Sequence, residues 1–339
     1  MFGFLSKKRG LGIEITEKYI RFCEIEKNGD FLSLRRFGRL SIPVGVFSGT
    51  NIENPHMLSE LVQSILNDSK SKVVRIVLPG ESQKFFNLLV PKSSSGEIIE
   101  HVIHGLKENV SFNEGQDEVV DIHILAKEDK VLSVRAATAT REFKHNYTPV
   151  LHIFERYDAH IERANQAALV AFAGEDSGSS IHVQFGDMFT SISIISGSRV
   201  VEYQEIPFST YRFLLEVQKK LTKPSHTTSN YLTTLGVYGA DVRDFAEQAI
   251  APLGIVIDHA ISNFSQKQNS TIGKITLGGA FAGYKGVSDM LSRYVRAEVS
   301  PAYPWHPFDP RFDETIYQMK KSETLEYLVT LGLAIECVE

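Results

Sequence analysis

Gly12-Ile13-Glu14-Ile15-Thr16 and His182-Val183-Gln184-Phe185-Gly186 open two strand–turn–strand units of the same kind, one in each half of the chain. Each stretch reads as a short strand that ends in a polar tip, followed by a second strand at 20–25 or 190–195. Thr16 and Gly186 are 170 positions apart in a chain of 339 residues. Two hairpins half a chain apart predict a duplicated core with a ligand cleft between its halves. The alternative is a chance overlay of two common motifs.

The length and composition are those of a globular protein with more than one domain. A chain of 339 residues is too long for one simple core, and 42% hydrophobic and 23% charged residues are ordinary values. The net charge of −5 argues against a broad basic surface for nucleic acid. The two cysteines, Cys23 and Cys337, lie in apolar runs. They are expected to be core residues in a reducing compartment, and no zinc-site spacing exists.

No apolar run approaches the ~20 residues that a membrane-spanning helix needs. The N-terminal segment, residues 1–9, places apolar residues before basic ones, which is the reverse of a secretory signal. This segment could touch an anionic membrane surface weakly, or it could be a frayed terminus. We therefore expect a cytoplasmic protein.

Hydrophobic periodicity and turn residues predict strands and helices of an α/β protein. In the first part of the chain we expect strands at 11–16, 19–26, 31–40 and 73–78 and a helix at 55–66. Residues 81–150 read as a βαββα unit that could stand as a small inserted domain. Its strands are expected at 83–90, 119–125 and 131–138, and its helices at 97–109 and 141–154.

The second half begins with a short strand at 160–163 and an Ala-rich helix at 164–173. After the second hairpin and a strand at 199–206, residues 209–272 look mainly helical. We expect breaks in these helices at Pro224, at Gly236 and at Pro252-Leu253-Gly254. A strand at 274–277 then runs into Gly278-Gly279. It is followed by a helix at 287–294, a strand at 297–299, a Pro-rich loop at 301–310 and a helix at 324–334.

Two hairpins, two inserted units, a strand-Gly-Gly-helix unit and a terminal helix follow one another in the order seen in the actin-like ATPase superfamily. The short motifs that point to one family within it are Val77-Leu78-Pro79-Gly80, Leu88-Leu89-Val90-Pro91, Glu97-Ile98-Ile99, Glu108-Asn109-Val110-Ser111-Phe112, Asp121-Ile122-His123-Ile124-Leu125, Leu277-Gly278-Gly279 and Thr330-Leu331-Gly332-Leu333-Ala334. Over nearly its whole length the chain resembles the PilM family of type IV pilus assembly, a relative of the FtsA cell-division proteins. Residues 335–339 do not supply the amphipathic helix with which FtsA proteins end, which favours the pilus family.

The resemblance implies an α/β fold of the actin-like, ribonuclease H-like type. Such a fold has two related lobes, an FtsA-type inserted subdomain and a central cleft. The first core would comprise residues 1–80, 151–175 and 320–339, with residues 81–150 as the inserted subdomain. The second core would comprise residues 176–208 and 273–319, with residues 209–272 as a helical subdomain over the cleft.

The resemblance also implies a nucleotide site between the two hairpin tips. In the superfamily, an Asp near each tip holds Mg²⁺ through water, and a Gly lets the backbone approach the phosphates. The matching positions, which are the candidate nucleotide-binding residues, are Glu14, Thr16, Gln184, Gly186, Thr190, Gly278 and Gly279.

Several of these positions depart from the family pattern. The first tip has Glu14 in place of Asp and Thr16 in place of Gly. A β-branched residue at positive φ would cost ~1–3 kcal/mol, so this tip is expected to take another shape. The second tip has the neutral Gln184 where a metal carboxylate is expected. Arg21 matches a basic residue that often follows the first strand, whereas Phe208-Ser209 replaces a usual Gly-Gly.

Two interpretations of the cleft remain open. Either it binds ATP with Mg²⁺ in an altered way, or the fold persists while nucleotide binding is weak or lost. Each missing polar contact would cost ~1 kcal/mol or more of nucleotide-binding free energy. The sequence does not require any cofactor. Glu162 and Asp187 could orient a water molecule, or they could be solvated surface charges. Efficient hydrolysis is not expected.

The resemblance implies a cytoplasmic scaffold of a type IV pilus machine, peripheral at the inner membrane through its partners. It implies binding of the cytoplasmic N-terminal tail of a PilN-like inner-membrane protein, in a groove between the first core and the inserted subdomain. The sequence does not identify the residues of this groove. Contacts with other pilus assembly proteins and a homo-oligomer are compatible with this role, and nucleic acid is not an expected partner.

Two alternative functions belong to the same superfamily. One is an active ATPase or a sugar-kinase-like phosphotransferase, and the other is an FtsA-like filament-forming protein. Enzymes of this kind need a positioned acid beside the nucleotide. The missing carboxylate at Gln184 argues against an enzyme.

Overall fold

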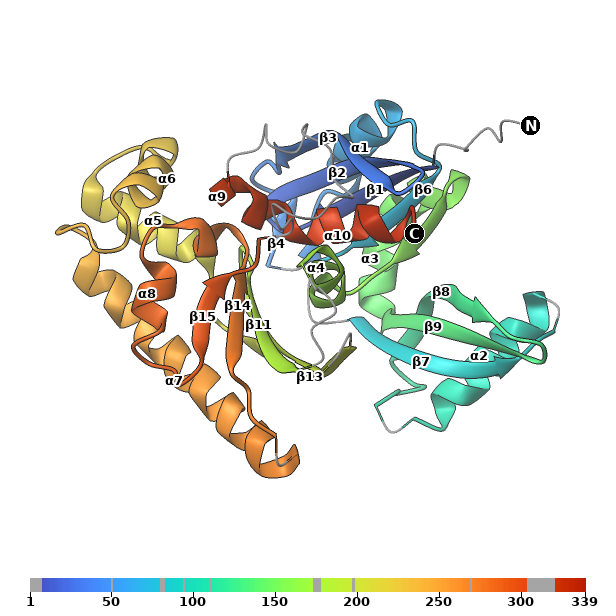
Figure 1. The fold of residues 1–339 in the computed structure, drawn as a ribbon. Helices are drawn as coiled ribbons and strands as arrows, with labels where there is room; N and C mark the ends of the chain where they lie inside the picture. The colour runs from blue at the N-terminus through green and yellow to red at the C-terminus, as the bar shows by residue number, and fades with distance from the viewer. Residues whose placement is uncertain are drawn as a thin grey trace.

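Two five-stranded sheets with the same strand order form the centre of the molecule (Figure 1). The computed structural model describes residues 8–49, 51–79, 83–93, 95–109, 111–172, 178–196, 199–268, 270–303 and 321–339. The N-terminal segment 1–7, the hairpin turn at 197–198 and the Pro-rich loop from residue 304 onward lie outside these ranges.

The first sheet is built on the first hairpin. Its strands are β1 (Lys8–Ile15), β2 (Tyr19–Asn28), β3 (Phe31–Ser41), β6 (Val73–Val77) and β10 (Asp158–Ile161), in the order β10-β6-β1-β2-β3. Strands β1 to β3 are antiparallel, and β6 and β10 run parallel to β1. Helix α1 (Pro55–Asn67) starts where the Asn54 side chain accepts the Met57 N–H, and a short β4–β5 ribbon (Phe47–Ser48, Asn51–Ile52) precedes it. We call this sheet and its helices the first lobe.

The second sheet repeats the first. Its strands are β11 (Ser179–Phe185), β12 (Thr190–Ser196), β13 (Arg199–Ile206), β14 (Lys274–Gly278) and β15 (Glu298–Pro301), in the order β13-β12-β11-β14-β15. Three strands are again antiparallel and two are parallel. We call this sheet and the helices packed on it the second lobe.

The two hairpins match residue by residue. Ile15 pairs with Ile20 at the first tip and Phe185 pairs with Thr190 at the second, so both partners are displaced by 170 positions. The first and last residues of each tip are joined by one backbone hydrogen bond of 2.9 Å, which runs from Thr16 to Tyr19 and from Gly186 to Phe189. The predicted duplicated fold is confirmed.

A three-stranded sheet stands beside the first lobe and forms the inserted subdomain. It contains β7 (Gln83–Pro91), α2 (Ser95–Lys107), β8 (Asp117–Lys127) and β9 (Val131–Thr140), with the strand order β7-β9-β8. Its own apolar core includes Phe86, Val102 and Val134. Helix α3 (Arg141–Leu151) and the 3₁₀ turn His152–Arg156 lead back to β10, and Phe143 and Tyr147 of α3 lie in the core of the first lobe.

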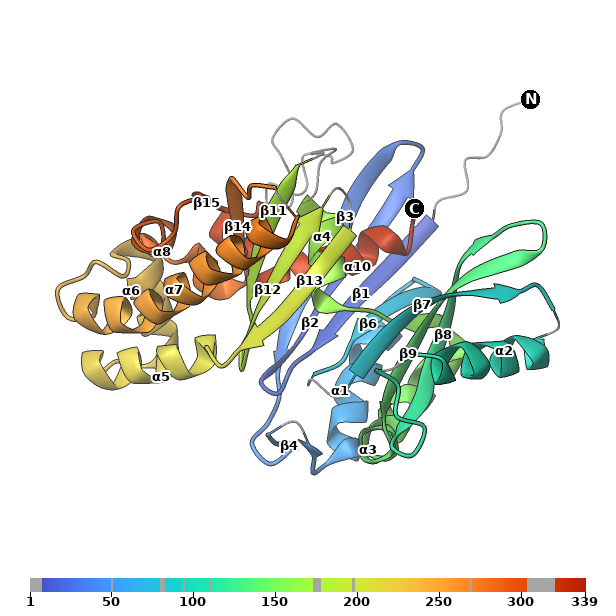
Figure 2. The ribbon, with the colours of Figure 1, turned by 90° about the horizontal axis from the view of Figure 1, so that it is seen from below.

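The helices of the second lobe cover one face of its sheet (Figure 2). They are α5 (Thr210–Leu221), α6 (Ser225–Thr234), α7 (Arg243–Gln268) and α8 (Val287–Leu291), with a 3₁₀ turn at Ala280–Gly283. The expected breaks at Pro224 and Gly236 are present, but the one at Pro252 is wrong because α7 continues through it. The buried face of α7, which includes Ile250 and Ile257, packs into the lobe core and outweighs the ~3 kcal/mol cost of an internal proline.

Two helices cross between the lobes (Figure 1). Helix α4 (Ala164–Phe172) follows the fifth strand of the first sheet, and α10 (Leu328–Glu336) comes after the fifth strand of the second, preceded by α9 (Lys321–Thr324) and a 3₁₀ turn, Leu325–Tyr327. A Cβ atom at Gly332 of α10 would overlap the Ala167 carbonyl of α4. A Cβ atom at Gly12 of β1 would overlap the Thr330 carbonyl of α10. These glycines allow α10 to lie directly on both α4 and β1.

Within the described ranges, none of the helices combines the length and the apolar character that crossing a membrane requires.

We predict that Gly332→Ala destabilises the protein by about 3 kcal/mol or more, because the added methyl group has no space at the crossing of α4 and α10. Chemical denaturation followed by circular dichroism measures this change. Gly105→Ala in α2 is the matched control, since its Cβ would meet Leu88 at an ordinary 3.5 Å. Alanine at this helical position should raise the free energy of unfolding by as much as about 1 kcal/mol. Equal effects at the two glycines would contradict the proposed close packing.

Candidate functional site

The two hairpin tips meet at the boundary between the lobes. The Thr16 hydroxyl of the first tip donates a hydrogen bond to Asp187 Oδ2 of the second tip at 2.8 Å. The backbone N–H of Tyr19 donates to Thr16 Oγ1 at 3.0 Å, which orients this hydroxyl. Thr222 is the one non-glycine residue at positive φ in the described part of the chain, so Thr16 avoids the strained conformation. The tips are therefore joined directly.

A row of charged side chains crosses the first sheet just below its tip. Glu14 of β1 is in register with Arg21 of β2, and Arg21 is in register with Arg39 of β3. Like charges on directly opposite residues repel each other unless an anion lies between them. Glu326, in the turn before α10, supplies this anion: its Oε1 accepts from Arg21 Nε at 3.1 Å and from Arg39 at 2.6 Å.

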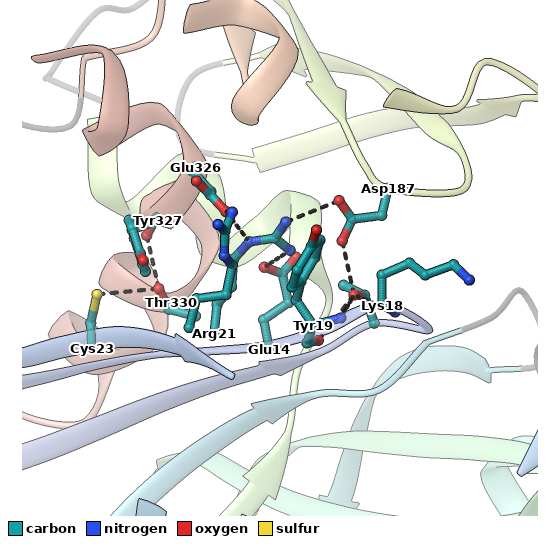
Figure 3. A network of polar contacts seen from close by, with 11 residues as sticks. Glu14, Lys18, Tyr19, Arg21, Cys23, Asp187, Glu326, Tyr327 and Thr330 are labelled. Carbon is teal, nitrogen blue, oxygen red and sulfur yellow. Dashed lines mark hydrogen bonds and ion pairs between the residues drawn. The ribbon is translucent and has the colours of Figure 1, made fainter. Parts of the chain in front are cut away.

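Arg21 is the centre of this network. Besides Glu326, its guanidinium donates to Asp187 Oδ1 at 3.0 Å and reaches Glu14 Oε2 at 3.4 Å (Figure 3). Only 6% of its side chain is exposed, and its three acidic partners are between 7% and 15% exposed. A buried charge is tolerated when it is paired and hydrogen-bonded, and the planar guanidinium offers five N–H donors.

The charges of this network do not cancel. Three carboxylates face the two guanidinium groups of Arg21 and Arg39, so one negative charge is in excess. Burial raises the pKa of Glu14 to about 7 against the opposing effect of Arg21. Burial alone would lower the pKa of Arg21, but Asp187, Glu14 and Glu326 together raise it well above its usual value. Glu14 also makes the longest of the three contacts with Arg21.

Gln184 occupies the position in the second lobe that matches Glu14 in the first. Its Oε1 lies 3.0 Å from His182 Nε2, and His182 Nδ1 lies 3.1 Å from the Thr276 hydroxyl. Burial lowers the pKa of His182 to about 4, so the ring is neutral at pH 7. The neutral ring lies between the Gln184 carboxamide and the Thr276 hydroxyl and contacts both. The carboxamide is thereby held by its own lobe.

The remaining predicted residues serve the second lobe. The Thr190 hydroxyl donates to the Phe208 carbonyl at 3.0 Å and is fully buried. Gly278 leaves room for the side chain of Gln184, which a Cβ atom would overlap. Gly279 has φ of +88° and its N–H donates to the Leu325 carbonyl at 2.9 Å, which ties the turn before α10 to this lobe.

A cleft of about 780 Å³ opens beside the joined tips, between the first lobe, the inserted subdomain and the second lobe. Its walls are the ends of β1 and β6, the first half of β7, the start of α4, the β11–β12 tip and the end of β13. Three of the seven candidate nucleotide residues line it, namely Glu14, Thr16 and Gly186. Gln184, Thr190, Gly278 and Gly279 are not among its lining residues.

Glu162 and Asp187 both line this cleft. The alternative that they are solvated surface charges is wrong. Glu162 is 2% exposed and Asp187 is 7% exposed. Glu162 Oε1 lies 3.0 Å from His123 Nδ1, and its other oxygen accepts from Arg135. Both partners belong to the inserted subdomain, so Glu162 ties that subdomain to the first lobe. These side chains hold the pKa of Glu162 below its usual value although burial opposes them.

Sequence reasoning identified Arg21 and Asp187 but missed Arg39 and Glu326. A signal for Arg39 existed, because pairing β2 with β3 places two arginines opposite each other. Glu326 carries no such signal, since it lies 305 residues from Arg21 in the sequence. Among the residues whose placement is described, no group of three or more His, Cys, Asp or Glu side chains is arranged to hold a metal ion.

Comparison of the sequence with family models gives no match, and no curated protein matches it.

Solved structures resemble the chain over nearly its whole length. The PilM–PilN type IV pilus biogenesis complex matches with a TM-score of 0.70 at 18% identity, covering 97% of this chain and 98% of that chain. The ethanolamine utilization protein EutJ from Carboxydothermus hydrogenoformans matches with a TM-score of 0.55 at 11% identity, covering 98% and 90%. MreB5 of Spiroplasma citri bound to ADP matches with a TM-score of 0.53 at 12% identity, covering 97% and 95%. At these identities the likeness establishes the fold, which is the actin-like fold.

We predict that Glu14→Gln changes the pH dependence of stability. The pKa of Glu14 is higher in the folded protein, about 7, than its ordinary value of 4.5, so the folded state binds the extra proton. The stability from this proton is complete below pH 4.5 and is lost as the pH rises through 7. Glu14→Gln stays neutral and should be more stable than the wild type at pH 8, by up to about 3 kcal/mol.

Urea denaturation between pH 5 and pH 8.5 measures the difference between the two proteins. Glu100→Gln is the control, because Glu100 is exposed on α2 and its replacement should leave the pH profile unchanged. A wild-type profile parallel to that of Glu14→Gln across this range would contradict the assignment of the proton to Glu14.

Proposed function

We propose that this protein is a scaffold of a type IV pilus assembly machine, acting at the cytoplasmic side of the inner membrane. Its task would be to bind the cytoplasmic tail of a PilN-like membrane protein. The support is the full-length likeness to the PilM–PilN complex together with a cleft that suits an extended segment. The cleft carries the proposal, because it is a feature of this chain itself.

The cleft is bordered by two strands that lie at the edges of their sheets. Strand β7 is the outer strand of the inserted subdomain, and β13 is the outer strand of the second lobe. Residues 83–86 of β7 and 203–205 of β13 both line the cleft. An edge strand carries backbone groups that can pair with an added strand. The Arg163 guanidinium donates to the Phe85 carbonyl at 2.6 Å, so a backbone carbonyl of this edge strand already accepts a hydrogen bond from outside its sheet.

The lining of the cleft also indicates the chemistry of the tail. Its apolar side chains include Leu78, Phe85 and Phe189. Its charged residues are five acids and two bases, and these are Glu14, Glu17, Glu162, Asp187, Glu205, Lys84 and Arg163. Glu14, Glu162 and Asp187 are already paired with cations of this chain. An extended segment that carries apolar side chains and places a basic one beside Glu17 or Glu205 would complement this lining, since charge complementarity selects among partners.

We propose further that the protein does not use Mg²⁺-ATP. The residues at the tips do not fit that ligand, because Arg21 and the Thr16 hydroxyl are already bonded to Asp187. Gln184 lacks the carboxylate that a hydrated Mg²⁺ prefers and is bonded within its own lobe. A triphosphate would also approach three buried carboxylates. These features oppose the alternatives of an ATPase and a phosphotransferase.

We predict that a synthetic peptide with the cytoplasmic tail of the cognate PilN-like protein binds this chain, as measured by isothermal titration calorimetry. Glu205→Lys should weaken binding about tenfold, because it places a positive charge beside a basic tail. Glu202→Lys is the control, since Glu202 belongs to the same strand but is not part of the cleft lining. It should change the affinity by less than about twofold. Absence of binding by the folded wild type, or equal losses in both variants, would refute this proposal.

We predict that Mg²⁺-ATP leaves the melting temperature of the wild type unchanged. A ligand that binds only the folded state at one hundred times its Kd stabilises that state by about 2.7 kcal/mol, which is easily detected. Differential scanning fluorimetry with millimolar nucleotide measures the effect, with Mg²⁺ alone as the control. A melting temperature that rises with nucleotide concentration would show that the protein binds nucleotide and would contradict this proposal.

A further inference from the structure

The contacts of Arg21 run from one lobe to the other. Arg21 and Arg39 belong to β2 and β3 of the first lobe, whereas Asp187 belongs to the second tip. Glu326 lies at the junction of the two lobes. Leu325 before it packs in the core of the second lobe and its carbonyl accepts the Gly279 N–H, whereas Tyr327 after it packs in the core of the first sheet. Arg21 of the first lobe thus binds Asp187 of the second lobe directly, and both Arg21 and Arg39 bind Glu326 at the junction.

We propose that the guanidinium of Arg21 takes the place of a divalent cation and holds the two lobes in one closed arrangement without any nucleotide. This inference concerns the relation of the lobes and goes beyond the proposed docking of a tail.

The geometry suits this role. A divalent cation between two hairpin tips would draw together carboxylates from both lobes, and Arg21 makes the same kind of contact with Glu14, Asp187 and Glu326. One guanidinium reaches all three because its N–H donors point outward in a plane, which a lysine ammonium on a thin stem cannot match. The site is almost closed to solvent, so the attraction is little weakened by water or salt.

Other contacts between the lobes agree with a closed arrangement. The Thr16 hydroxyl binds Asp187, and the Asn165 side chain of α4 donates to the Ser193 hydroxyl of β12 at 3.1 Å. Lys18 of the first tip lies 4.5 Å from the ring centre of Tyr211 in α5. Arg21 is a buried charge that forms ion pairs with Asp187 of the second lobe and with Glu326. Its removal should therefore change the distance between the lobes more than the loss of the other contacts.

The test measures the distance between the lobes. Spin labels are attached to Met57→Cys in α1 and Ile255→Cys in α7, both at exposed positions of different lobes. Burial raises the pKa of the two native thiols, Cys23 and Cys337, to about 12, so they label slowly. Pulsed electron–electron double resonance then reports the distribution of distances between the two labels, with and without Mg²⁺-ATP.

We expect one narrow distribution in the otherwise unaltered protein, and the same distribution with Mg²⁺-ATP. In Arg21→Met the distribution should broaden toward longer distances. Arg296→Met is the matched control, because Arg296 makes a paired contact with Asp258 inside the second lobe alone, and it should leave the distribution unchanged. An unchanged distribution in Arg21→Met, or a shift on adding Mg²⁺-ATP to the protein with Arg21, would overturn the proposal.

Two further variants keep the test decisive if Arg21→Met does not fold. Asp187→Asn keeps the size of the side chain and a hydrogen-bond acceptor but removes the charge, so it should also broaden the distribution. In Arg21→Ala, millimolar guanidinium should restore the narrow distribution, because this planar cation can enter the space among the three carboxylates. A narrow distribution in Asp187→Asn, or no restoration by guanidinium in Arg21→Ala, would contradict the assigned role. Failure of a tail peptide to bind would leave this inference standing.

Discussion

The burial of one guanidinium group between two lobes is the constraint on which the centre of this molecule depends. Arg21 lies where solvent is nearly excluded, so the chain must bring acidic partners to it. The pairing of β1 with β2 brings Glu14, the second hairpin brings Asp187, and the turn before α10 brings Glu326. Each partner arrives on a different element. The register of the sheets, the closure of the tips and the path of the last helix are thus all coupled to one charge.

The duplicated hairpins have diverged into complementary halves. A displacement of 170 positions matches Glu14 with Gln184, Thr16 with Gly186 and Glu17 with Asp187. The first copy holds the cation and a hydroxyl donor, and the second copy holds the carboxylate that accepts from both. A symmetric pair of acidic tips would need an added cation to come together. The asymmetry removes that need.

The fold was largely predictable from the sequence, whereas the site was predictable only in part. The hairpins and the strands and helix between residues 83 and 140 follow from local patterns of apolar and turn residues, and they appear close to where they were expected. The continuation of α7 through Pro252 was not foreseen, because packing of Ile250 and Ile257 on the lobe core overrides the local preference. The role of Glu326 depends on a contact between distant parts of the chain. Gln184 could be recognised as an exception, but its bond to His182 could not.

The crossing of α4 and α10 has a consequence for how the protein is made. The core that lines the inner face of the first sheet includes Cys23 and Ile25 from the start of the chain and Leu331 and Ile335 from its last helix. Ribosomes deliver these parts in order, at about 5–20 residues per second, so the earliest strands wait tens of seconds for the helix that covers them. During synthesis their apolar face is open to other surfaces. The first lobe can therefore complete this core only after the last helix has been synthesised.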